Sequence, residues 1–483
     1  MFDVGIIGCG IIGAAAAFEL SKYRVSTLIL EGENDVADGT TKANSAILHA
    51  GYDPEPGTLM AKLNVEGSFL AERICRDLDV PYRKTGSLVL AFSDRDCETV
   101  ENLYRRGKQN GVPGLSVLNA EQVLGMEPNL SLKVRGALYA PTAAVVSPWE
   151  YCLALAETAV ENGAVLRRDA RVTKIERIPE GYRITASGRP YEARYVINAA
   201  GVHAEEVHNL AAAPSFHIIP MRGEYFILDK SEGRTVSRVI FQCPTERGKG
   251  VLVAPTVGGN LIVGPNAEQL DRGAGENTAT TASGMAFVAK TAKESVPGLD
   301  FRQTIRSFAG VRAASDRDDF IIEQAKGAPG FLDLAGIRSP GLTAAPAIAE
   351  TAIGILEESG LKREKKTDFR ARRRRIRFAD LSPEEKARLV KEDPSYGRVI
   401  CRCETVTEGE ILACMKTPIP PCSVDGVKRR VNAGMGRCQG GFCGPRVVEI
   451  LSRELHIPPD RVLKDKDGSY ILTGKTRGGG GNV

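Results

Sequence analysis

Near its N-terminus the sequence reads Val4-Gly5-Ile6-Ile7-Gly8-Cys9-Gly10-Ile11-Ile12-Gly13, an apolar run that leads into the pattern G-x-G-x-x-G. An alanine-rich segment at 14–22 follows and predicts a helix, and the apolar run 25–30 predicts a second strand that ends in Glu31. Strand, glycine turn, helix, strand and terminal acid in this order predict a βαβ unit that binds a dinucleotide.

Each part of this motif has a physical reason. The glycines let the backbone approach a pyrophosphate, and the helix N-terminus after Gly10 offers free N–H groups and the positive end of the helix dipole. Glu31 suits the ribose hydroxyls and would repel a 2′-phosphate, which argues against a 2′-phosphorylated adenosine. The motif alone leaves FAD and NAD open.

Outward from this unit, residues 1–360 predict an α/β body. We expect strands at 4–7, 25–30, 195–198 and 331–335, helices at 14–22, 59–78 and 150–162, and antiparallel strands at 223–228 and 251–264 with a turn at 258–260. The alternation of these types predicts two interleaved domains. The expected Rossmann-like nucleotide domain comprises 1–80, 145–212 and 325–360, and the substrate domain, with a mixed or antiparallel sheet, comprises 81–144 and 213–324.

Composition limits the class of protein. The chain has 483 residues, of which 42% are apolar and 26% charged, so it is neither wholly disordered nor fibrous. It begins without a signal-peptide pattern, and no apolar run reaches the ~18 residues of a membrane span. We therefore expect a cytoplasmic protein with no transmembrane segment. Disulfides are rare in the cytoplasm.

Residues 362–377 hold ten basic and two acidic residues, so this segment carries +8 in a chain whose net charge is +4. We interpret 361–395 as a basic linker, either solvated or lying as a strap on an acidic face. No reader motif accompanies the charge, so no nucleic-acid partner is expected. A helix is expected to begin at Ser382-Pro383.

Two later segments resemble elements of two-dinucleotide-binding flavoproteins. Tyr195-Val-Ile-Asn-Ala-Ala-Gly201 looks like the element that closes on the nucleotide, and Gly336-Ile-Arg-Ser-Pro-Gly-Leu-Thr-Ala-Ala-Pro-Ala347 looks like the C-terminal flavin element, with a helix expected at 347–357. With Asn44-Ser-Ala-Ile-Leu-His-Ala-Gly51 and Arg222-Gly-Glu-Tyr225, they resemble the D-amino-acid-oxidase-like superfamily of FAD-dependent oxidoreductases, and most of all L-2-hydroxyglutarate dehydrogenases. The resemblance implies FAD, bound by Gly8, Gly10, Ile12, Gly13, Glu31, Ser45, Val172, Ala200, Gly201, Gly336, Gly341, Leu342 and Thr343.

The same resemblance implies catalytic residues. His49 occupies the family's flavin-facing position and is the first candidate for the base, with flavin orientation or a covalent flavin link as alternatives. Arg312 is expected to anchor the anionic group of the substrate, and Arg222 with the hydroxyl of Tyr225 is the second candidate. For each arginine, a structural ion pair remains the alternative.

Six of the eleven cysteines lie within 401–443. Cys401, Cys403, Cys438 and Cys443 form two close pairs, which suit a [2Fe–2S] cluster or an all-cysteine zinc site, and unligated thiols are the third option. The glycine-rich surroundings resemble the bacterioferritin-associated-ferredoxin-like [2Fe–2S] domain, also found at the end of the anaerobic glycerol-3-phosphate dehydrogenase large subunit. We place a small helical [2Fe–2S] module at 396–455 and a tail at 456–483 whose glycines, 478–481, are expected to be loose.

Flavin and cluster together predict a dehydrogenase acting on CH–OH donors. The body resembles 2-hydroxy-acid enzymes and the C-terminal module resembles glycerol-3-phosphate enzymes, which carry Gly-Gly-Lys where this chain has Gly336-Ile-Arg338. The expected substrate is a small anion of the glycerol 3-phosphate or L-2-hydroxyglutarate type. Electrons would pass to redox partner subunits or a quinone-linked acceptor, in a homo- or hetero-oligomer that reaches the membrane only through partners. The alternatives are an amino- or imino-acid dehydrogenase and a non-catalytic electron relay.

Overall fold

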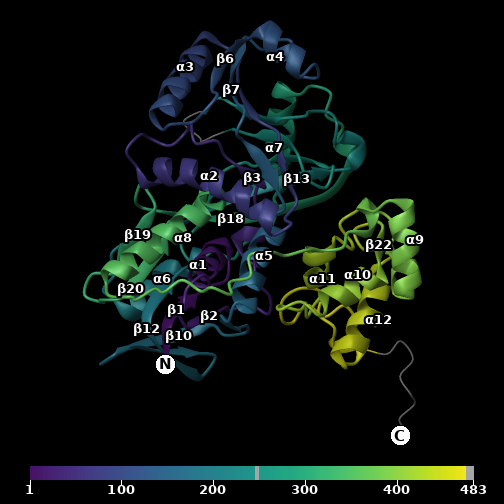
Figure 1. The fold of residues 1–483 in the computed structure, drawn as a ribbon. Coiled ribbons are helices and arrows are strands. Elements are labelled where there is room, and N and C mark those ends of the chain that lie inside the picture. The colour runs from purple at the N-terminus through teal and green to yellow at the C-terminus, as the bar shows by residue number, and fades with distance from the viewer. Residues whose placement is uncertain (245–249, 475–483) are drawn as a thin grey trace, which may run out of the picture. The chain divides into compact units, whose positions relative to one another are not determined.

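The structure is a computed structural model that describes residues 1–244 and 250–474 (Figure 1). Its contacts divide the chain into two compact units. Unit 1 comprises 1–32 and 36–373, and unit 2 comprises 33–35 and the chain from 374 onward. Each unit is described by itself.

The first sheet of unit 1 contains the predicted βαβ unit. Its strands run in the order β10-β11-β12-β1-β2-β9, and β20 pairs with β12 and β19. β1, β2, β9, β12 and β20 are mutually parallel, so their carboxyl ends meet at one edge. The bounds are β1 Phe2–Ile7, β2 Thr27–Leu30, β9 Val165–Arg167, β10 Val172–Ile178, β11 Gly181–Ala186, β12 Arg189–Asn198, β19 Ile321–Gln324 and β20 Phe331–Ala335.

Helices pack closely around this sheet. The bounds are α1 Ile11–Leu20, α2 Leu59–Asp77, α5 Pro148–Glu161, α6 Ala204–Ala211 and α8 Gly341–Glu358. α1 packs against both α5 and α8, and α8 packs against α2. The alanines at 14–17 are all buried, and their small side chains permit this close approach.

The second sheet of unit 1 has cores on both faces. It runs β17-β13-β16-β15-β14-β5-β7-β6, with β18 on β13. Along β5, Val89 and Ala91 enter one core with Tyr225, whereas Leu88 and Leu90 enter the other. The bounds are β5 Ser87–Ala91, β6 Ser116–Asn119, β7 Gly136–Ala140, β13 Ile218–Leu228, β14 Val239–Gln242, β15 Leu252–Pro255, β16 Leu261–Gly264, β17 Glu268–Gln269 and β18 Thr304–Ser315.

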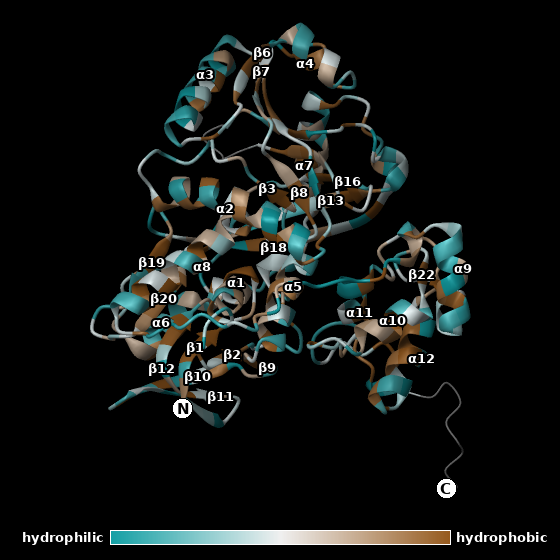
Figure 2. Ribbon diagram, viewed as in Figure 1, coloured by the Kyte–Doolittle hydropathy of each residue, from teal (hydrophilic) through white to brown (hydrophobic). Residues whose placement is uncertain are grey.

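Three helices cover this sheet, and a small sheet lies beside it. α3 (Asp94–Gln109) contributes to the core that contains Tyr225, while α4 (Ala120–Met126) and α7 (Ala282–Ser295) contribute to the opposite core. The hydrophilic outer face of α3 is visible in Figure 2. The small sheet joins β3 (Ile47–Leu48), β8 (Ala144–Val146) and β4 (Tyr82–Lys84).

The first part of the basic segment lies on unit 1. Arg373 pairs with the buried Glu157 at 2.7 Å, and Arg370 with Glu161 at 3.5 Å, both on α5. Phe369 packs edge-on against Phe18 of α1. Up to residue 373 the segment is therefore a strap on an acidic face.

Unit 2 is a small helical module. It contains α9 Pro383–Glu392, β21 Val399–Cys401, β22 Val406–Thr407, α10 Glu408–Cys414, α11 Val424–Val431 and α12 Gly444–Leu455. Capping boxes begin α9 at Ser382 and α10 at Thr407, which confirms the predicted start at Ser382. The apolar face of α12 packs with Ile411 and Val427 in one core.

Most of the expected elements are present, with one marked error. The predicted helix at 347–357 begins six residues earlier, at Gly341, with Pro346 inside it. Pro346 lies in the second turn of this helix, although proline lacks the N–H that an interior position would use. The mixed α/β class with a helical C-terminal module is confirmed. The domain boundaries stay predictions. The tail is described to residue 474, where Val462 is buried, and the glycines at 478–481 lie outside the described residues.

Candidate functional site

The glycine turn after β1 is required by close backbone contacts. A Cβ on Gly13 would lie 2.0 Å from the carbonyl oxygen of Gly8, and one on Gly8 would lie 2.6 Å from that of Ala199. Gly8 also has φ +96°, which favours glycine. Gly10 differs, because its Cβ would meet only Thr41 Oγ1, at 3.3 Å. Gly8 and Gly13 therefore pack the turn, and Gly10 leaves room for a ligand.

Glu31 and the start of α1 fit the two ends of an adenosine diphosphate. The Glu31 carboxylate accepts a hydrogen bond from Cys9 N–H at 2.7 Å, which holds it beside the turn. The N-cap residue of α1, Gly10, has no side chain that could cap the helix, and Thr41 Oγ1 accepts a hydrogen bond from the Ile11 N–H at 3.0 Å. The remaining first-turn N–H groups, which include that of Ile12, suit a pyrophosphate.

The other residues expected at the cofactor come from three segments. Ala200 and Gly201 follow β12, directly after the carbonyl that touches Gly8. Gly336 follows β20 with φ +62°. Gly341, Leu342 and Thr343 form the first turn of α8, which also lacks a side-chain cap. Val172 packs with Leu30 in the core of the first sheet. Glycine turn, acid and uncapped helix ends together fit FAD.

His49 lies where β3 meets the start of α8. Its backbone N–H donates to Thr343 Oγ1 at 2.9 Å, and its Nε2 lies 3.2 Å from Ser339 Oγ. The ring stacks on Phe241 with centroids 5.8 Å apart. The imidazole therefore lies beside the C-terminal flavin element, and its flavin-facing role stays a prediction.

Tyr225, Ser45 and Arg312 form a second polar group. The Tyr225 hydroxyl lies 3.2 Å from Ser45 Oγ and accepts from Arg312 Nη2 at 3.4 Å. Its ring stacks on Phe308 with centroids 4.8 Å apart. A Cβ on Gly223 would lie 2.4 Å from Arg312 Nη2, so this glycine makes room for the guanidinium. The structure thus brings together a cation and two hydroxyls, which suit an anionic substrate group.

Arg222 does not join this group. It is 4% exposed, pairs with Glu268 at 2.7 Å and donates to the carbonyl of Ala279 at 2.8 Å. Because strand side chains alternate, Arg222 and Tyr225 point to opposite faces of β13. Its contacts match the structural ion pair that was the alternative for this residue.

Sequence reasoning missed three neighbours of the site. Ser339 lies within the quoted flavin element, and its position before Pro340 was the only available signal. Thr41 closes the glycine turn, and Phe241 covers His49 from β14. Neither of these two belongs to a recognisable motif.

The four cysteines of the module converge as two pairs. Cys403 and Cys438 have sulfurs 3.8 Å apart, while Cys401 and Cys443 share a hydrogen bond. Among the described residues, no group of three or more His, Cys, Asp or Glu side chains fits a single metal ion. Two thiol pairs fit one iron each of a two-iron cluster. A Cβ on Gly436 would lie 2.3 Å from that of Cys403, so the glycine-rich loop permits this approach.

Hydrogen bonds favour thiolates at this site. The Cys443 thiol and the N–H groups of Gly434 and Glu404 lower the pKa of Cys401 to about 6. The pKa of Cys443 shifts upward, because the two sulfurs share one proton. The N–H of Phe442 is the main cause of a lowered pKa at Cys438. These backbone donors are the groups expected to face cluster sulfurs.

The remaining cysteines have other roles. Cys414 is buried and donates to the carbonyl of Ile411, and Cys422 donates to that of Asn34 within unit 2. The eleven cysteines all lie in the described residues, and no disulfide joins them there.

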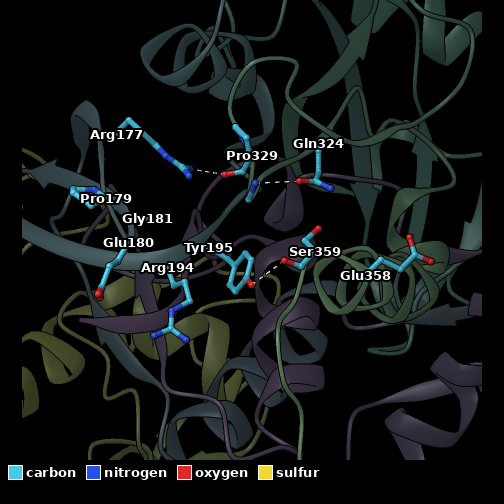
Figure 3. Close-up of a pocket in the computed structure, with 11 residues that line it drawn as sticks. Arg177, Pro179, Glu180, Gly181, Arg194, Tyr195, Gln324, Pro329, Glu358 and Ser359 are labelled. Atoms are coloured by element: carbon cyan, nitrogen blue, oxygen red, sulfur yellow. Dashed lines mark hydrogen bonds between the residues drawn. The ribbon is translucent and has the colours of Figure 1, made fainter.

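A separate hollow of about 630 Å³ lies at the other end of unit 1 (Figure 3). It is lined by the β10–β11 turn, Arg194 and Tyr195 in β12, and the end of α8, where the Tyr195 hydroxyl donates to the Ser359 carbonyl at 3.1 Å. α8 is 18 residues long, so ~27 Å of helix separates this hollow from Gly341. None of the predicted site residues lines it.

Two family models match the chain. Residues 3–353 match the model described as FAD dependent oxidoreductase, and residues 399–453 match the BFD-like [2Fe-2S] binding domain. The expectations of FAD and a [2Fe–2S] cluster are thereby confirmed. Among the described residues, every helix is too short or too polar to span a bilayer.

The chain is similar to curated proteins of two kinds. A glycerol 3-phosphate dehydrogenase from Caloramator mitchellensis is 51% identical over 478 residues, which cover 99% of both chains. A glycerol 3-phosphate oxidase from Mycoplasma genitalium is 32% identical over 76% of this chain and 97% of its own. The mitochondrial L-2-hydroxyglutarate dehydrogenase of Mus musculus is 32% identical, over 54% of this chain and 60% of its own.

A solved structure supports the fold. The L-alpha-glycerophosphate oxidase from Mycoplasma pneumoniae with FAD bound has a TM-score of 0.73 and 32% identity, and covers 77% of this chain and 98% of its own. The glycerol-3-phosphate dehydrogenase from Bacillus halodurans, at 16% identity and a TM-score of 0.64, shares the fold over 94% of this chain.

Proposed function

The chain belongs to the FAD-dependent oxidoreductase family, and on that premise we propose that it is a dehydrogenase that oxidises glycerol 3-phosphate. The single observation that carries this substrate is the 51% identity to a glycerol 3-phosphate dehydrogenase over 99% of both chains. The L-2-hydroxyglutarate dehydrogenases are 27–32% identical and match 54–72% of the chain.

Arg312, Tyr225 and Ser45 are proposed to bind the phosphate. A guanidinium offers several N–H donors to one phosphate, and the two hydroxyls add neutral donors. Because Tyr225 is 2% exposed and stacked on Phe308, its hydroxyl is held in place before substrate arrives. This group would fix the substrate end that does not react.

His49 is proposed to accept the proton of the substrate hydroxyl at Nε2. In the tautomer with its proton on Nδ1, the Ser339 hydroxyl donates to Nε2 over 3.2 Å. That nitrogen is then unprotonated, and the substrate hydroxyl would replace the Ser339 hydroxyl as the donor to its lone pair, as a general base requires. Phe241 on one side and the backbone bond to Thr343 on the other limit the motion of the ring.

The cofactors divide the remaining chemistry. When bound, FAD supplies the acceptor for the substrate hydride, and the [2Fe–2S] cluster supplies one-electron chemistry. Gly10, Glu31 and the N-terminal turns of α1 and α8 would hold FAD, and Cys401, Cys403, Cys438 and Cys443 would hold the cluster. We propose that the final electron acceptor lies outside the chain, in a redox partner or quinone-linked subunit. We also propose that the protein is cytoplasmic and associates with a membrane only through partners.

Anaerobic titration of the purified holoenzyme tests this proposal. Glycerol 3-phosphate should bleach the flavin absorbance, while L-2-hydroxyglutarate and a panel of amino acids should not. Bleaching by L-2-hydroxyglutarate alone, or by an amino acid alone, would replace the proposed substrate. No bleaching by any of them would favour an electron relay.

A further inference from the structure

The thiol pairs of unit 2 differ sharply in exposure. Cys401 and Cys443 are 1% and 2% exposed, within the core formed with α12. Cys403 is exposed and Cys438 half-buried. A cluster held by these four side chains therefore has one edge in the core of unit 2 and one edge at its surface, on the side of Cys403 and Cys438.

The sequence neighbours of the four cysteines include three arginines and one phenylalanine with exposed side chains. Arg402 lies between the first two cysteines, Arg437 precedes Cys438, and Arg446 lies three residues after Cys443 in α12; all three are exposed. Phe442 is 82% exposed. We call Arg402, Arg437, Phe442 and Arg446 the cluster rim.

Two acids adjoin the cluster rim in sequence, against its three arginines. Glu404 is half-buried against the Gly436 turn, and Glu449 pairs with Arg446 at 2.7 Å. The net charges of the two units also favour an acidic partner for unit 2. Unit 1 has forty-four basic and forty-four acidic residues, whereas unit 2 has twenty against sixteen, so unit 2 carries the whole net charge of +4.

We propose that the cluster rim is the docking surface for a one-electron carrier protein whose surface around its own redox centre is acidic. Electrostatic complementarity steers such encounters, and small redox interfaces depend on few contacts. A large exposed aromatic together with arginines is the composition that interface hot spots favour. This rests on the proposed dehydrogenase function, which requires an acceptor outside the chain.

The transfer at this surface is simple in chemical terms. One electron leaves the chain, the carrier's centre gains that electron, and no bond forms or breaks. Two docking events are needed for each substrate oxidised. The exposed thiol pair marks the side on which a docked carrier approaches the cluster most closely.

The experiment measures binding, with the full-length holoprotein in its oxidised state and no substrate. The probes are cytochrome c, a basic one-electron carrier, and the same protein made acidic by succinylation of its lysines. The succinylated form should bind at least about tenfold more tightly than the native form, with an affinity that falls as salt is added. Equal affinities for the two forms would overturn the proposal.

Variants then locate the surface. R402Q/R437Q should weaken binding of the succinylated form about tenfold at low salt and flatten the salt dependence, and F442A should weaken it several-fold at all salt concentrations. R461Q is the matched control, because Arg461 is exposed beyond the C-terminal end of α12, ~18 Å of helix from Cys443. Unchanged affinity in R402Q/R437Q would refute the cluster rim.

Three further readouts separate the alternatives. Iron, sulfide and the electron paramagnetic resonance of the dithionite-reduced cluster establish that each variant contains its cluster. If R402Q/R437Q loses its cluster, R446Q carries the test.

A shifted reduction potential with unchanged carrier binding would mean that the arginines only offset the cluster's negative charge. If substrate-driven cluster reduction slows in R402Q/R437Q while carrier binding is unchanged, the rim serves the flavin unit, and the proposal fails. Because binding needs no substrate, these outcomes do not depend on whether glycerol 3-phosphate reduces the flavin.

Discussion

The two ends of the flavin site are built in opposite ways. The nucleotide end is centred on a contiguous stretch from Gly8 to Glu31, in which backbone atoms and missing Cβ atoms form the surface, and Ala199 and Thr41 join it from elsewhere. The substrate end is assembled from side chains on β13, β18 and the loops around His49 and Ser339, segments up to 290 residues apart. One end is specified locally, and the other exists only after the second sheet has folded.

This difference predicts different consequences of mutation. Changes at the nucleotide end should alter cofactor retention and stability, because the contacts there are steric. Changes at the substrate end should alter turnover or substrate affinity with the cofactor retained, because each side chain is held by several others.

His49→Gln should lower the rate of flavin reduction by about 10²–10⁴-fold, the usual contribution of a general base. FAD content should be unchanged, since the backbone bond of residue 49 to Thr343 remains. Stopped-flow reduction by glycerol 3-phosphate measures the rate. His203→Gln is the matched control, because His203 lies on the surface between Glu206 and Glu276. An unchanged rate would remove His49 as base, and loss of FAD would break the division between the two ends.

The contrast between the ends also explains how far sequence reasoning reached. The βαβ unit, its glycines and Glu31 follow from local spacing, because neighbours in sequence are neighbours in space. Arg312 and Tyr225 needed a family resemblance, since nothing in their own surroundings places them together. Arg222 shows the limit of such reasoning, because only the strand register reveals that it faces away from the site. Phe241 left no signal at all.

Gly13→Ala should destabilise unit 1 and reduce its FAD content. The new Cβ would meet the Gly8 carbonyl at 2.0 Å, and backbone cannot move aside as a flexible side chain can. The expected cost is about 3 kcal/mol, at the upper end for overpacking. Thermal unfolding and flavin absorbance per chain measure it. Gly354→Ala in α8, where a Cβ meets nothing within 4 Å, should instead be neutral or slightly stabilising. Equal behaviour of the two variants would contradict the steric interpretation.

Tyr225→Phe tests the substrate end more gently. It removes one hydroxyl between Ser45 and Arg312 and keeps the stacking on Phe308. We expect KM for glycerol 3-phosphate to rise about fivefold, the effect of one hydrogen bond worth about 1 kcal/mol, with little change in kcat. Steady-state kinetics separate the two constants. Tyr182→Phe, whose hydroxyl donates to the Pro329 carbonyl, is the control and should leave both unchanged. A fall in kcat alone would place Tyr225 in the reacting step.

Asp35 lies four residues after Glu31, yet its side chain pairs with residues far away in sequence within unit 2. It therefore tests where the locally specified stretch that begins at Gly8 ends. It is buried, and its carboxylate accepts from Arg430 at 2.8 Å and Arg429 at 3.0 Å. Burial would raise the pKa of Asp35, but the two arginines hold it well below its usual value.

A lowered pKa in the folded state means that the charged carboxylate stabilises unit 2 at neutral pH and down to about pH 4, the value of an unfolded aspartate. This stabilisation is lost as the pH falls further, and we expect a loss on the order of 1 kcal/mol by about pH 3. Hydrogen exchange of peptides from α11, followed as the pH falls, measures it. Asp35→Asn should lack this component, while Asp425→Asn, on the more accessible face of α11, should retain it. If the wild type and Asp35→Asn lost protection in parallel, the ion pairs of Asp35 with Arg429 and Arg430 would not contribute to acid stability. Residues 33–35 would then belong with the locally specified stretch from Gly8 to Glu31.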